Sequence, residues 1–217
     1  MNKNEKFVIT LNRELGSGGR TVGRKLAEKL GVPFYDKALI KALTEKYNLS
    51  VEEIERLKGR NHSWWADFKR AMNIGSGVSS SRNYQVETTK LPDLLTTDEM
   101  FQTEQEVLKG IAADESCVVA GRSGFYVFRN HPNHVSVFIQ ASMESRVERV
   151  ARKQGLTAEE ARQTIERIDQ MRENYVKKYT DTSRYDTRNY DLVVRADGKS
   201  EDELADLIIK YINLTSK

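Results

Sequence analysis

The stretch that decides how this chain folds reads Asn12-Arg13-Glu14-Leu15-Gly16-Ser17-Gly18-Gly19-Arg20-Thr21. It follows directly on the apolar run at residues 7–11, and a helical pattern over residues 21–30 begins at once. A buried strand that passes through a glycine-rich loop into a helix can cradle phosphate, because small residues let backbone N–H groups turn toward an anion at the helix N-terminus. The sequence therefore predicts a phosphate-binding loop over residues 16–21.

The loop matches the P-loop pattern GxxxxGK[ST] only in part. Gly19 and Thr21 match, whereas Arg20 replaces the lysine and Glu14 replaces the first glycine. Arg20 keeps a permanent positive charge, and its planar fork can bind two phosphate oxygens at once. Thr21 would offer its hydroxyl to Mg²⁺. We therefore expect a degenerate P-loop in which Gly16, Ser17, Gly18, Gly19, Arg20 and Thr21 bind the phosphates of ATP.

Two other interpretations of the same glycines remain open. The glycines would also permit a tight strand-to-helix turn without any ligand. Gly16-Ser17-Gly18 begins a GxGxxG pattern as well, and Asp36 lies near the place of a ribose-binding acid in a dinucleotide fold. Thr21 stands where that pattern needs its third glycine, and a dinucleotide site leaves the arginine-rich segment 146–188 without a role. The phosphate loop is the stronger hypothesis.

Composition excludes several classes of protein. The chain has 217 residues, of which 38% are apolar and 31% charged, a length and balance typical of one globular domain. Its apolar runs are far shorter than the roughly 20 residues of a membrane helix, and we expect no membrane association and no signal segment. The single cysteine, Cys117, excludes an internal disulfide and suits a cytoplasmic protein. A net charge of +3 gives no case for nucleic-acid binding.

Strand-like and helical patterns alternate along the rest of the chain. Continuous β-branched runs are typical of strands buried on both faces, as in parallel sheets. Capping boxes predict helices that begin after Ser50, Thr157 and Ser200. We expect strands at residues 7–11, 32–36, 117–120, 135–139 and 190–194, with helices at 21–30, 37–47, 50 onward, 97–113, 125–129, 142–153, 157–178 and 200 onward. This order predicts an α/β fold with a doubly wound parallel sheet, formed by residues 1–217 as one domain.

Residues 59–96 differ in character from the rest of the chain. His62-Ser63-Trp64-Trp65 opens a partly helical patch, and Gly75–Ser81 has the composition of a flexible loop. We expect an inserted helical lobe that binds the acceptor. The Trp64-Trp65 pair admits three roles, which are stacking on a base, packing in the core, or contact with a second copy of the chain in a homodimer.

At this point the motifs together resemble the cytidylate kinase-like family, a branch of the P-loop nucleoside monophosphate kinases. The resemblance rests on motifs in the family's order across residues 7–195: the loop 12–20, Gly31-Val32-Pro33-Phe34-Tyr35-Asp36-Lys37, Val119-Ala120-Gly121-Arg122, Phe138-Ile139-Gln140-Ala141, Arg146-Val147-Glu148-Arg149-Val150 and Asp169-Gln170-Met171-Arg172. It implies ATP and Mg²⁺, small-molecule nucleotides as ligands, and a lid-like helical region at residues 142–180.

The resemblance also implies roles for individual residues. Asp36, Arg122, Asp169 and Arg172 stand where such kinases hold the acceptor nucleotide. Arg146 and Arg149 stand where a lid helix supplies arginines to the transferring phosphoryl group, and they join Arg20 as the residues expected to act in catalysis. Such roles suit phosphoryl transfer, which needs positioning and charge stabilisation more than covalent chemistry.

The chain departs from the wider cytidylate kinase pattern at three places. Ala120 and Ser123 flank the Gly-Arg pair where acids are usual, and Ile165 stands where an arginine is usual, four residues before Asp169. We expect transfer of the ATP γ-phosphoryl group to a small acceptor, a nucleoside monophosphate such as CMP. The departures keep two alternatives open: a nucleotide-binding regulatory or sensor module without turnover, and an interaction protein on a vestigial kinase fold.

Overall fold

The structure, a computed structural model, describes residues 1–37, 39–40, 44, 49–58, 64–71 and 98–215. The described elements are, in chain order, β1 (Val8–Arg13), α1 (Gly19–Leu30), β2 (Phe34–Asp36), α3 (Val51–Lys58), α4 (Trp64–Ala71), α5 (Asp98–Asp114), β3 (Cys117–Ala120), α6 (Gly124–Val127), β4 (His134–Gln140), α7 (Met143–Gln154), α8 (Ala158–Thr180), the 3₁₀ turn η2 (Thr187–Asn189), β5 (Leu192–Arg195) and α9 (Glu201–Thr215). All five expected strands are present within a few residues of the predicted bounds.

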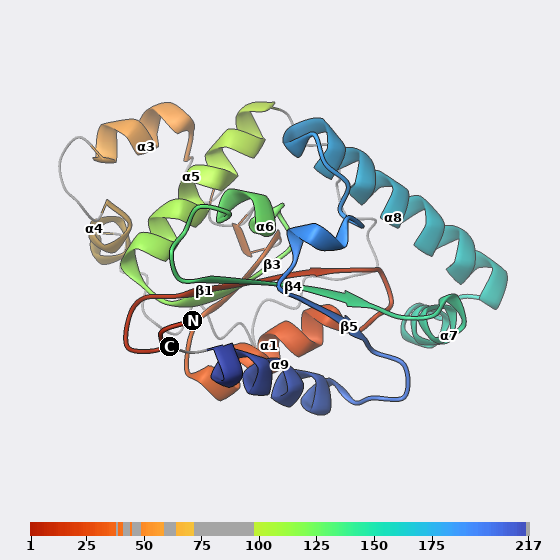
Figure 1. Cartoon of the computed structure of the whole chain (residues 1–217). Helices are drawn as coiled ribbons and strands as arrows, with labels where there is room; N and C mark the ends of the chain where they lie inside the picture. The colour runs from red at the N-terminus through yellow and green to blue at the C-terminus, as the bar shows by residue number, and fades with distance from the viewer. Residues whose placement is uncertain (38, 41–43, 45–48, 59–63, 72–97, 216–217) are drawn as a thin grey trace.

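The five strands form one sheet in the order β2-β3-β1-β4-β5, and every pairing is parallel (Figure 1). β1 is central, and Val8 lies opposite Cys117 on one side and His134 on the other. Every residue of β3 is buried, as are the first four of β1. The predicted parallel sheet with strands buried on both faces is therefore confirmed.

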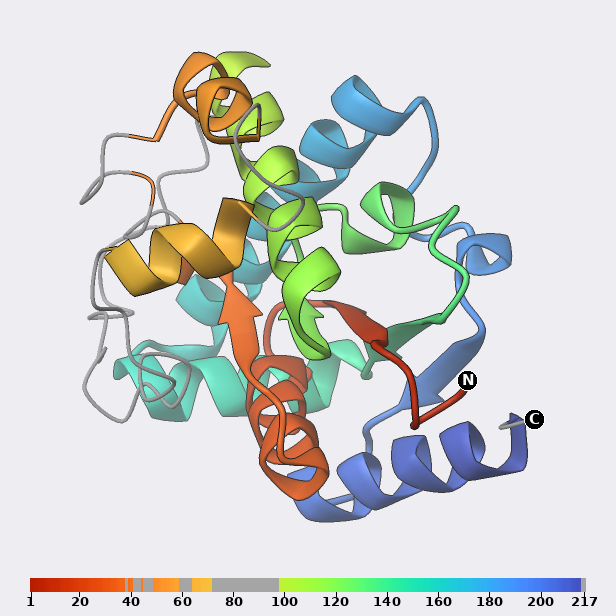
Figure 2. The ribbon, with the colours of Figure 1, turned by 90° about the vertical axis from the view of Figure 1, so that its left-hand side faces the viewer.

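Helices cover both faces of the sheet (Figures 1 and 2). On one face α1 and α9 pack together, and their apolar side chains join those of the sheet around Leu26 and Ile208. On the other face α5 is covered by α3 and α4, and the core there includes Trp64, Trp65 and Leu108. The tryptophan pair thus packs in the core, one of its three predicted roles, with rings 5.6 Å apart and nearly perpendicular.

The helix-end signals are confirmed where the structure describes them. Gly31 ends α1 in the left-handed conformation with φ 66°. Thr157 and Glu160 form the predicted capping box of α8, and Ser200 caps α9 in the same way with Glu203. Ser50 accepts a hydrogen bond from the Glu53 N–H at 3.2 Å and so begins α3.

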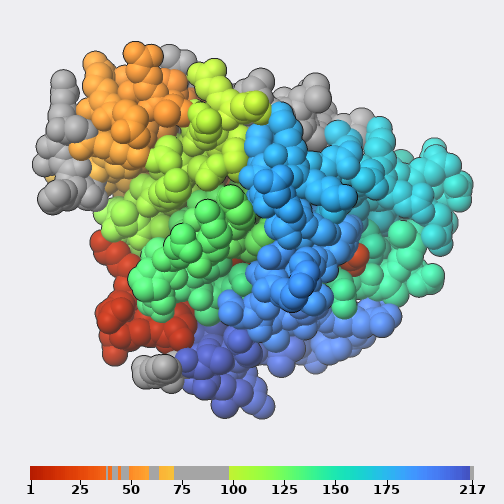
Figure 3. Space-filling view, turned by 45° about the horizontal axis from the view of Figure 1, so that its top comes forward, coloured from red at the N-terminus to blue at the C-terminus, as the bar shows by residue number. Residues whose placement is uncertain are grey.

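The predicted lid region consists of two helices that pack on each other. Val150 of α7 and Ile165 of α8 form a small separate core with Ala161, so Ile165 fills an apolar role. The far end of α8 reaches α5, where Lys178 pairs with Asp98 (2.6 Å) and the two helices lie in contact (Figure 3).

Some sequence predictions lie outside the described residues. Of the inserted lobe at 59–96 the structure describes only 64–71, which form α4, and the Gly75–Ser81 loop lies outside. Most of the helix predicted at 37–47 does as well. None of the helices in the described ranges is long and apolar enough to cross a membrane.

Parallel strands place their carboxyl ends at one edge of the sheet, where α/β proteins bind ligands. In this chain β1 ends at the glycine-rich loop, β2 ends at Asp36, β3 leads into Gly121-Arg122, and β4 leads through Ala141 into α7. The topology therefore brings the motifs that stood apart in the sequence to a single edge.

Candidate active site

The glycine-rich loop has the backbone form of a phosphate cradle. Gly16 and Gly18 adopt φ angles of 87° and 81°, which disfavour other residues, and Gly18 is the N-cap of α1. Within the described part of the chain, the backbone N–H groups of Gly18, Gly19 and Arg20 make no hydrogen bond. Unpartnered N–H groups at the start of a helix attract anions. The loop can therefore receive phosphate oxygens.

Glu14 explains how the loop closes without the usual first glycine. Its carboxylate accepts a hydrogen bond from the Ala141 N–H (2.9 Å) and lies 3.3 Å from the guanidinium of Arg146. Its carbonyl accepts the Ser17 hydroxyl at 2.9 Å. Glu14 thus joins the ends of β1 and β4 and fixes the first turn of the loop.

Asp169 of α8 is the central carboxylate of the site. It binds the guanidiniums of Arg146, Arg172 (3.3 Å) and Arg184 (3.2 Å), and it accepts the Leu15 N–H at 3.1 Å. Its side chain is only 8% exposed, so these interactions are shielded from water. Burial, opposed by Asp169, lowers the pKa of Arg172 to about 10, which leaves it charged at pH 7. Asp169 therefore holds the loop and three arginines in one arrangement.

Arg20 and Asp36 are bound to each other. Arg20 Nε donates to the Asp36 carboxylate at 2.6 Å, and the other oxygen of Asp36 accepts the Leu39 N–H at 3.1 Å. The guanidinium of Arg20 is one-third exposed, whereas Asp36 is buried. The ion pair therefore joins the first turn of α1 to the end of β2.

Arg122 lies in a buried aromatic environment. It pairs with Glu104 of α5, and its guanidinium stacks on the ring of Tyr175 at 5.0 Å. Both Arg122 and Ser123 have positive φ angles, 56° and 52°, which is uncommon for residues with a side chain. Burial lowers the pKa of Arg122. Glu104 thus places a carboxylate beside Arg122, although the positions that flank the Gly-Arg pair are Ala120 and Ser123.

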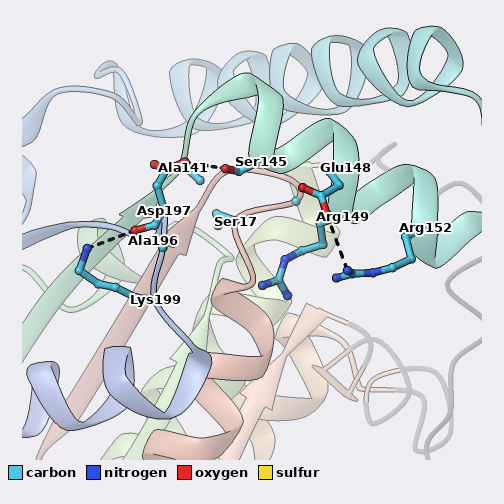
Figure 4. Close-up of a pocket in the computed structure, with 11 residues that line it drawn as sticks. Ser17, Ala141, Ser145, Glu148, Arg149, Arg152, Ala196, Asp197 and Lys199 are labelled. Atoms are coloured by element: carbon cyan, nitrogen blue, oxygen red, sulfur yellow. Dashed lines mark hydrogen bonds and ion pairs between the residues drawn. The ribbon is translucent and has the colours of Figure 1, made fainter.

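A cavity of about 220 Å³ opens beside the loop. Gly16 and Ser17 line one side of it, α7 lines the second, and the turn at residues 196–199 lines the third (Figure 4). Arg149 extends from α7 toward the loop, and a Cβ atom added at Gly18 would lie 3.1 Å from its Cζ. Arg149 also pairs with Glu201 of α9. A cation is thus held directly over the phosphate cradle.

Asp197 fixes the turn on the far side of this cavity. It accepts hydrogen bonds from the Ser142 N–H (3.1 Å), the Ser142 hydroxyl (2.5 Å) and the Ser145 hydroxyl (2.7 Å). The hydrogen bonds from Ser142, Arg195 and Ser145 hold the pKa of Asp197 well below its usual range. The turn is thereby joined to the first turn of α7.

The family model of the cytidylate kinase-like family matches residues 8–197. The chain belongs to this family. The match spans β1, every arginine described above and Asp197, so the predicted family is confirmed over nearly the whole chain.

Individual relatives of this family member are distant. The chain is 26% identical over 209 residues to a cytidylate kinase from Methanopyrus kandleri. This alignment covers 90% of this chain and 88% of the relative. A crystal structure of an uncharacterized protein from Eubacterium ventriosum is 24% identical, with a TM-score of 0.69 over 97% of this chain and 99% of the other. A shikimate kinase from Acinetobacter baumannii is 18% identical over 96% of this chain, with a TM-score of 0.48.

Family membership and the phosphate-binding fold support a kinase that acts on a nucleotide or another small molecule. Such a kinase uses ATP as co-substrate and usually Mg²⁺. The structure places the predicted residues in two groups. The first group lies around the glycine-rich loop and Asp169 and consists of Arg20, Asp36, Arg146 and Arg172. The second group lies at the edges of this region, where Arg149 lines the cavity and Arg122 packs against α5.

Sequence reasoning missed four residues of this site. Three of them are Glu104, Arg184 and Glu14, which enter the site through ion pairs with residues far away in the chain. No local sequence pattern indicates such pairs. Arg13 had a signal, because it stands directly between a buried strand and a glycine-rich loop.

Proposed function

We propose that this protein transfers the γ-phosphoryl group of ATP to a nucleoside monophosphate such as CMP. The observation that supports it most is the juxtaposition of an open backbone cradle at residues 16–20 with arginines held by Asp169 and Glu14. Phosphoryl transfer is catalysed mainly by positioning and by positive charge around the transferring group. The site supplies both.

In this proposal the loop binds the donor phosphates and Arg149 closes on them. The N–H groups of Gly18 and Gly19 would contact phosphate oxygens, while Arg20 neutralises developing charge. Arg149 lies over Gly18 and lines the cavity, so it can reach the transferring group. Arg146 Nε donates to the Leu15 carbonyl at 2.8 Å, and its buried guanidinium would act from behind the loop.

The acceptor would lie toward Asp36 and Arg122. Asp36 ends β2 and Arg122 follows β3, and these two strands lie on the side of β1 away from β5. Asp169 and Arg172 would act on the acceptor through the charge network they share with Arg13 and Arg184. The two substrates would then meet at the carboxyl end of β1.

The loop residues fit a magnesium ion shared with the donor phosphates. Thr21 is partly exposed, and its hydroxyl makes no hydrogen bond with the described residues. Across those residues no group of three or more His, Cys, Asp and Glu side chains can hold a metal. Mg²⁺ bound to nucleotide phosphates needs only one or two protein ligands, and Thr21 would be one. When bound, the ion would supply positive charge that offsets the charge of the donor phosphates.

The test is incubation of the pure protein with Mg·ATP and CMP, dCMP, UMP, AMP, GMP and several alcohols without phosphate. Mass spectrometry would identify the phosphorylated product. We expect a nucleoside diphosphate from at least one monophosphate. No product from any member of the panel would contradict the proposal.

A nucleotide-binding regulatory module is the second candidate. One observation favours it: the arginine at the P-loop lysine position is bound to Asp36 rather than free. Calorimetry would then detect binding of Mg·ATP, while product analysis would detect no newly phosphorylated compound.

A further inference from the structure

Leu15, at the start of the glycine-rich loop, is held by the hairpin that α7 and α8 form (residues 143–180). Its N–H donates to Asp169 of α8 at 3.1 Å, and its carbonyl accepts a hydrogen bond from Nε of Arg146 in α7 at 2.8 Å. Its side chain packs against the small core around Ile165, between the two helices. One residue of the loop is therefore joined to both helices of the hairpin.

The main chain of the loop also lies directly against α7. A Cβ atom added at Gly16 would lie 2.8 Å from the carbonyl oxygen of Arg146 and 3.0 Å from its Cα. Such a distance is too short for any side chain, and Gly16 also has a φ of 87°. Because this contact joins main chain to main chain, no side-chain rotation can relieve it. The loop and the first turn of α7 are thus closely packed.

Arg146 adds charged contacts to this packing. Besides its bond to the Leu15 carbonyl, its guanidinium lies 3.3 Å from the carboxylate of Glu14 and pairs with Asp169. Both Arg146 and Asp169 are buried, and breaking a buried ion pair is costly because it leaves uncompensated charge. If the hairpin opened away from the loop, it would have to break these pairs together with the packing of Leu15.

We propose that Leu15 is a positioning residue that fixes the donor loop to the α7–α8 hairpin, so that nucleotide binding at the loop and packing of the hairpin core stabilise each other. This inference rests on the proposed function, in which residues 16–21 bind the donor phosphates. Coupling between two sites is reciprocal. A change in the core that reaches the loop must therefore alter nucleotide affinity, and bound nucleotide must stabilise the hairpin. The base of the predicted lid then moves with the loop.

The chain offers a matched pair of leucines for the test. Leu15 and Leu156 are both half-buried and both pack against the core around Ile165. Leu156 lies in the connection between α7 and α8, at the end of the hairpin away from the loop. Leu15→Ala and Leu156→Ala therefore remove the same atoms from the same core, but only the first residue belongs to the loop. Leu15→Met keeps the volume of the side chain and serves as the rescue variant, and Leu15→Val gives the same comparison with a smaller change.

Thermal unfolding and calorimetry with Mg·ADP are measured on the full-length protein. Leu15→Ala and Leu156→Ala should each lower the Tm by about 3–8 °C, because each leaves space in the core. Leu15→Ala should weaken Mg·ADP binding by about 5- to 50-fold, whereas Leu156→Ala should change it by less than about threefold. Leu15→Met should bind Mg·ADP nearly as tightly as the unmodified protein. A loss of stability alone would affect both alanine variants alike.

Hydrogen exchange measures the reciprocal effect. Saturating Mg·ADP should slow exchange in peptides from α7 and α8 of the unmodified protein and of Leu156→Ala. In Leu15→Ala at the same saturation, the slowing should be confined to the loop. Without nucleotide, Leu15→Ala should exchange faster than Leu156→Ala in the peptide that spans residues 12–22.

Three results would overturn the inference. They are an equal loss of Mg·ADP affinity in the two alanine variants, an unchanged affinity in Leu15→Ala, and no slowing of exchange in the hairpin when Mg·ADP binds the unmodified protein. Failure of Mg·ADP to bind the unmodified protein would overturn the inference and the donor site together. The proposed function fails separately: if the coupling is found but no acceptor is phosphorylated by Mg·ATP, the coupling stands and the kinase activity does not.

Discussion

The substitution Asp169→Asn tests whether one buried carboxylate holds the site together. Asparagine keeps the size of the side chain and can still accept the Leu15 N–H, but it carries no charge. The guanidiniums of Arg146 and Arg184, whose side chains are 7% and 0% exposed, would lose an opposite charge. Only Arg146 would keep another carboxylate, that of Glu14 at 3.3 Å.

The expected cost follows from this geometry. Removal of one partner from a buried ion pair costs about 3–5 kcal/mol, because it leaves an uncompensated charge. Since Arg146 keeps Glu14, we expect the lower end, about 3 kcal/mol. That is a large share of the roughly 5–15 kcal/mol by which a typical domain is stable.

Urea unfolding measures this cost directly. The two tryptophans, Trp64 and Trp65, are both buried and report on unfolding by fluorescence. The matched control is Glu148→Gln, which removes the carboxylate of an exposed ion pair: Glu148 is 77% exposed and lies 3.9 Å from Arg152. The free energy of unfolding of this variant should barely differ from that of the unmodified protein. A loss below about 1 kcal/mol in Asp169→Asn is the value expected of an exposed pair. Such a result would show that Asp169 does not hold the site together.

Three further predictions concern the turn after β3, the lid and pH. Gly121→Ala and Gly155→Ala both place a side chain at positive φ, so each should lower the free energy of unfolding, measured in urea, by about 1–2 kcal/mol. Only Gly121→Ala should also raise the KM for the acceptor, because only at that position would the new Cβ meet Arg13. Equal KM values in the two variants would contradict this. Arg149→Met should lower kcat by about 100-fold or more, as for arginines that stabilise the transferring phosphoryl group, with little change in the urea midpoint; an unchanged kcat would remove Arg149 from the mechanism. Burial lowers the pKa of His134 from 6.5 to about 4, so the folded protein binds fewer protons than the unfolded chain between these values. The free energy of unfolding should therefore be highest above pH 6.5 and fall by up to about 3 kcal/mol toward pH 4, and His134→Gln should show a smaller fall in urea titrations across that range.

The sequence predicted those parts of the fold that depend on local patterns. The β-branched runs gave the strands, and the capping boxes at Thr157 and Ser200 marked where α8 and α9 begin. Gly31 marked the end of α1. Each of these signals lies within a few residues of the feature it predicts, so no knowledge of tertiary contacts was needed.

The pairing of charges within the site could not be predicted in the same way. Arg122, after β3, pairs with Glu104 of α5. Arg20, in the first turn of α1 after β1, pairs with Asp36 of β2, because β1 and β2 both flank β3. The acids expected beside the Gly-Arg pair are absent from Ala120 and Ser123, yet carboxylates reach the region from other elements. Residues so far apart in the sequence become neighbours only through the order of the strands in the sheet. The sequence patterns used above do not predict that order.

The proposed function requires that the site move a phosphoryl group from ATP to an acceptor. It is tested most directly with ATP whose γ-phosphoryl oxygens carry a heavy isotope, incubated with Mg²⁺, the protein and the monophosphate that binds best. We expect a nucleoside diphosphate whose added phosphoryl group carries the label, at a rate that falls sharply in Arg149→Met. Label found only in free phosphate, or a diphosphate formed equally fast by the variant, would contradict it.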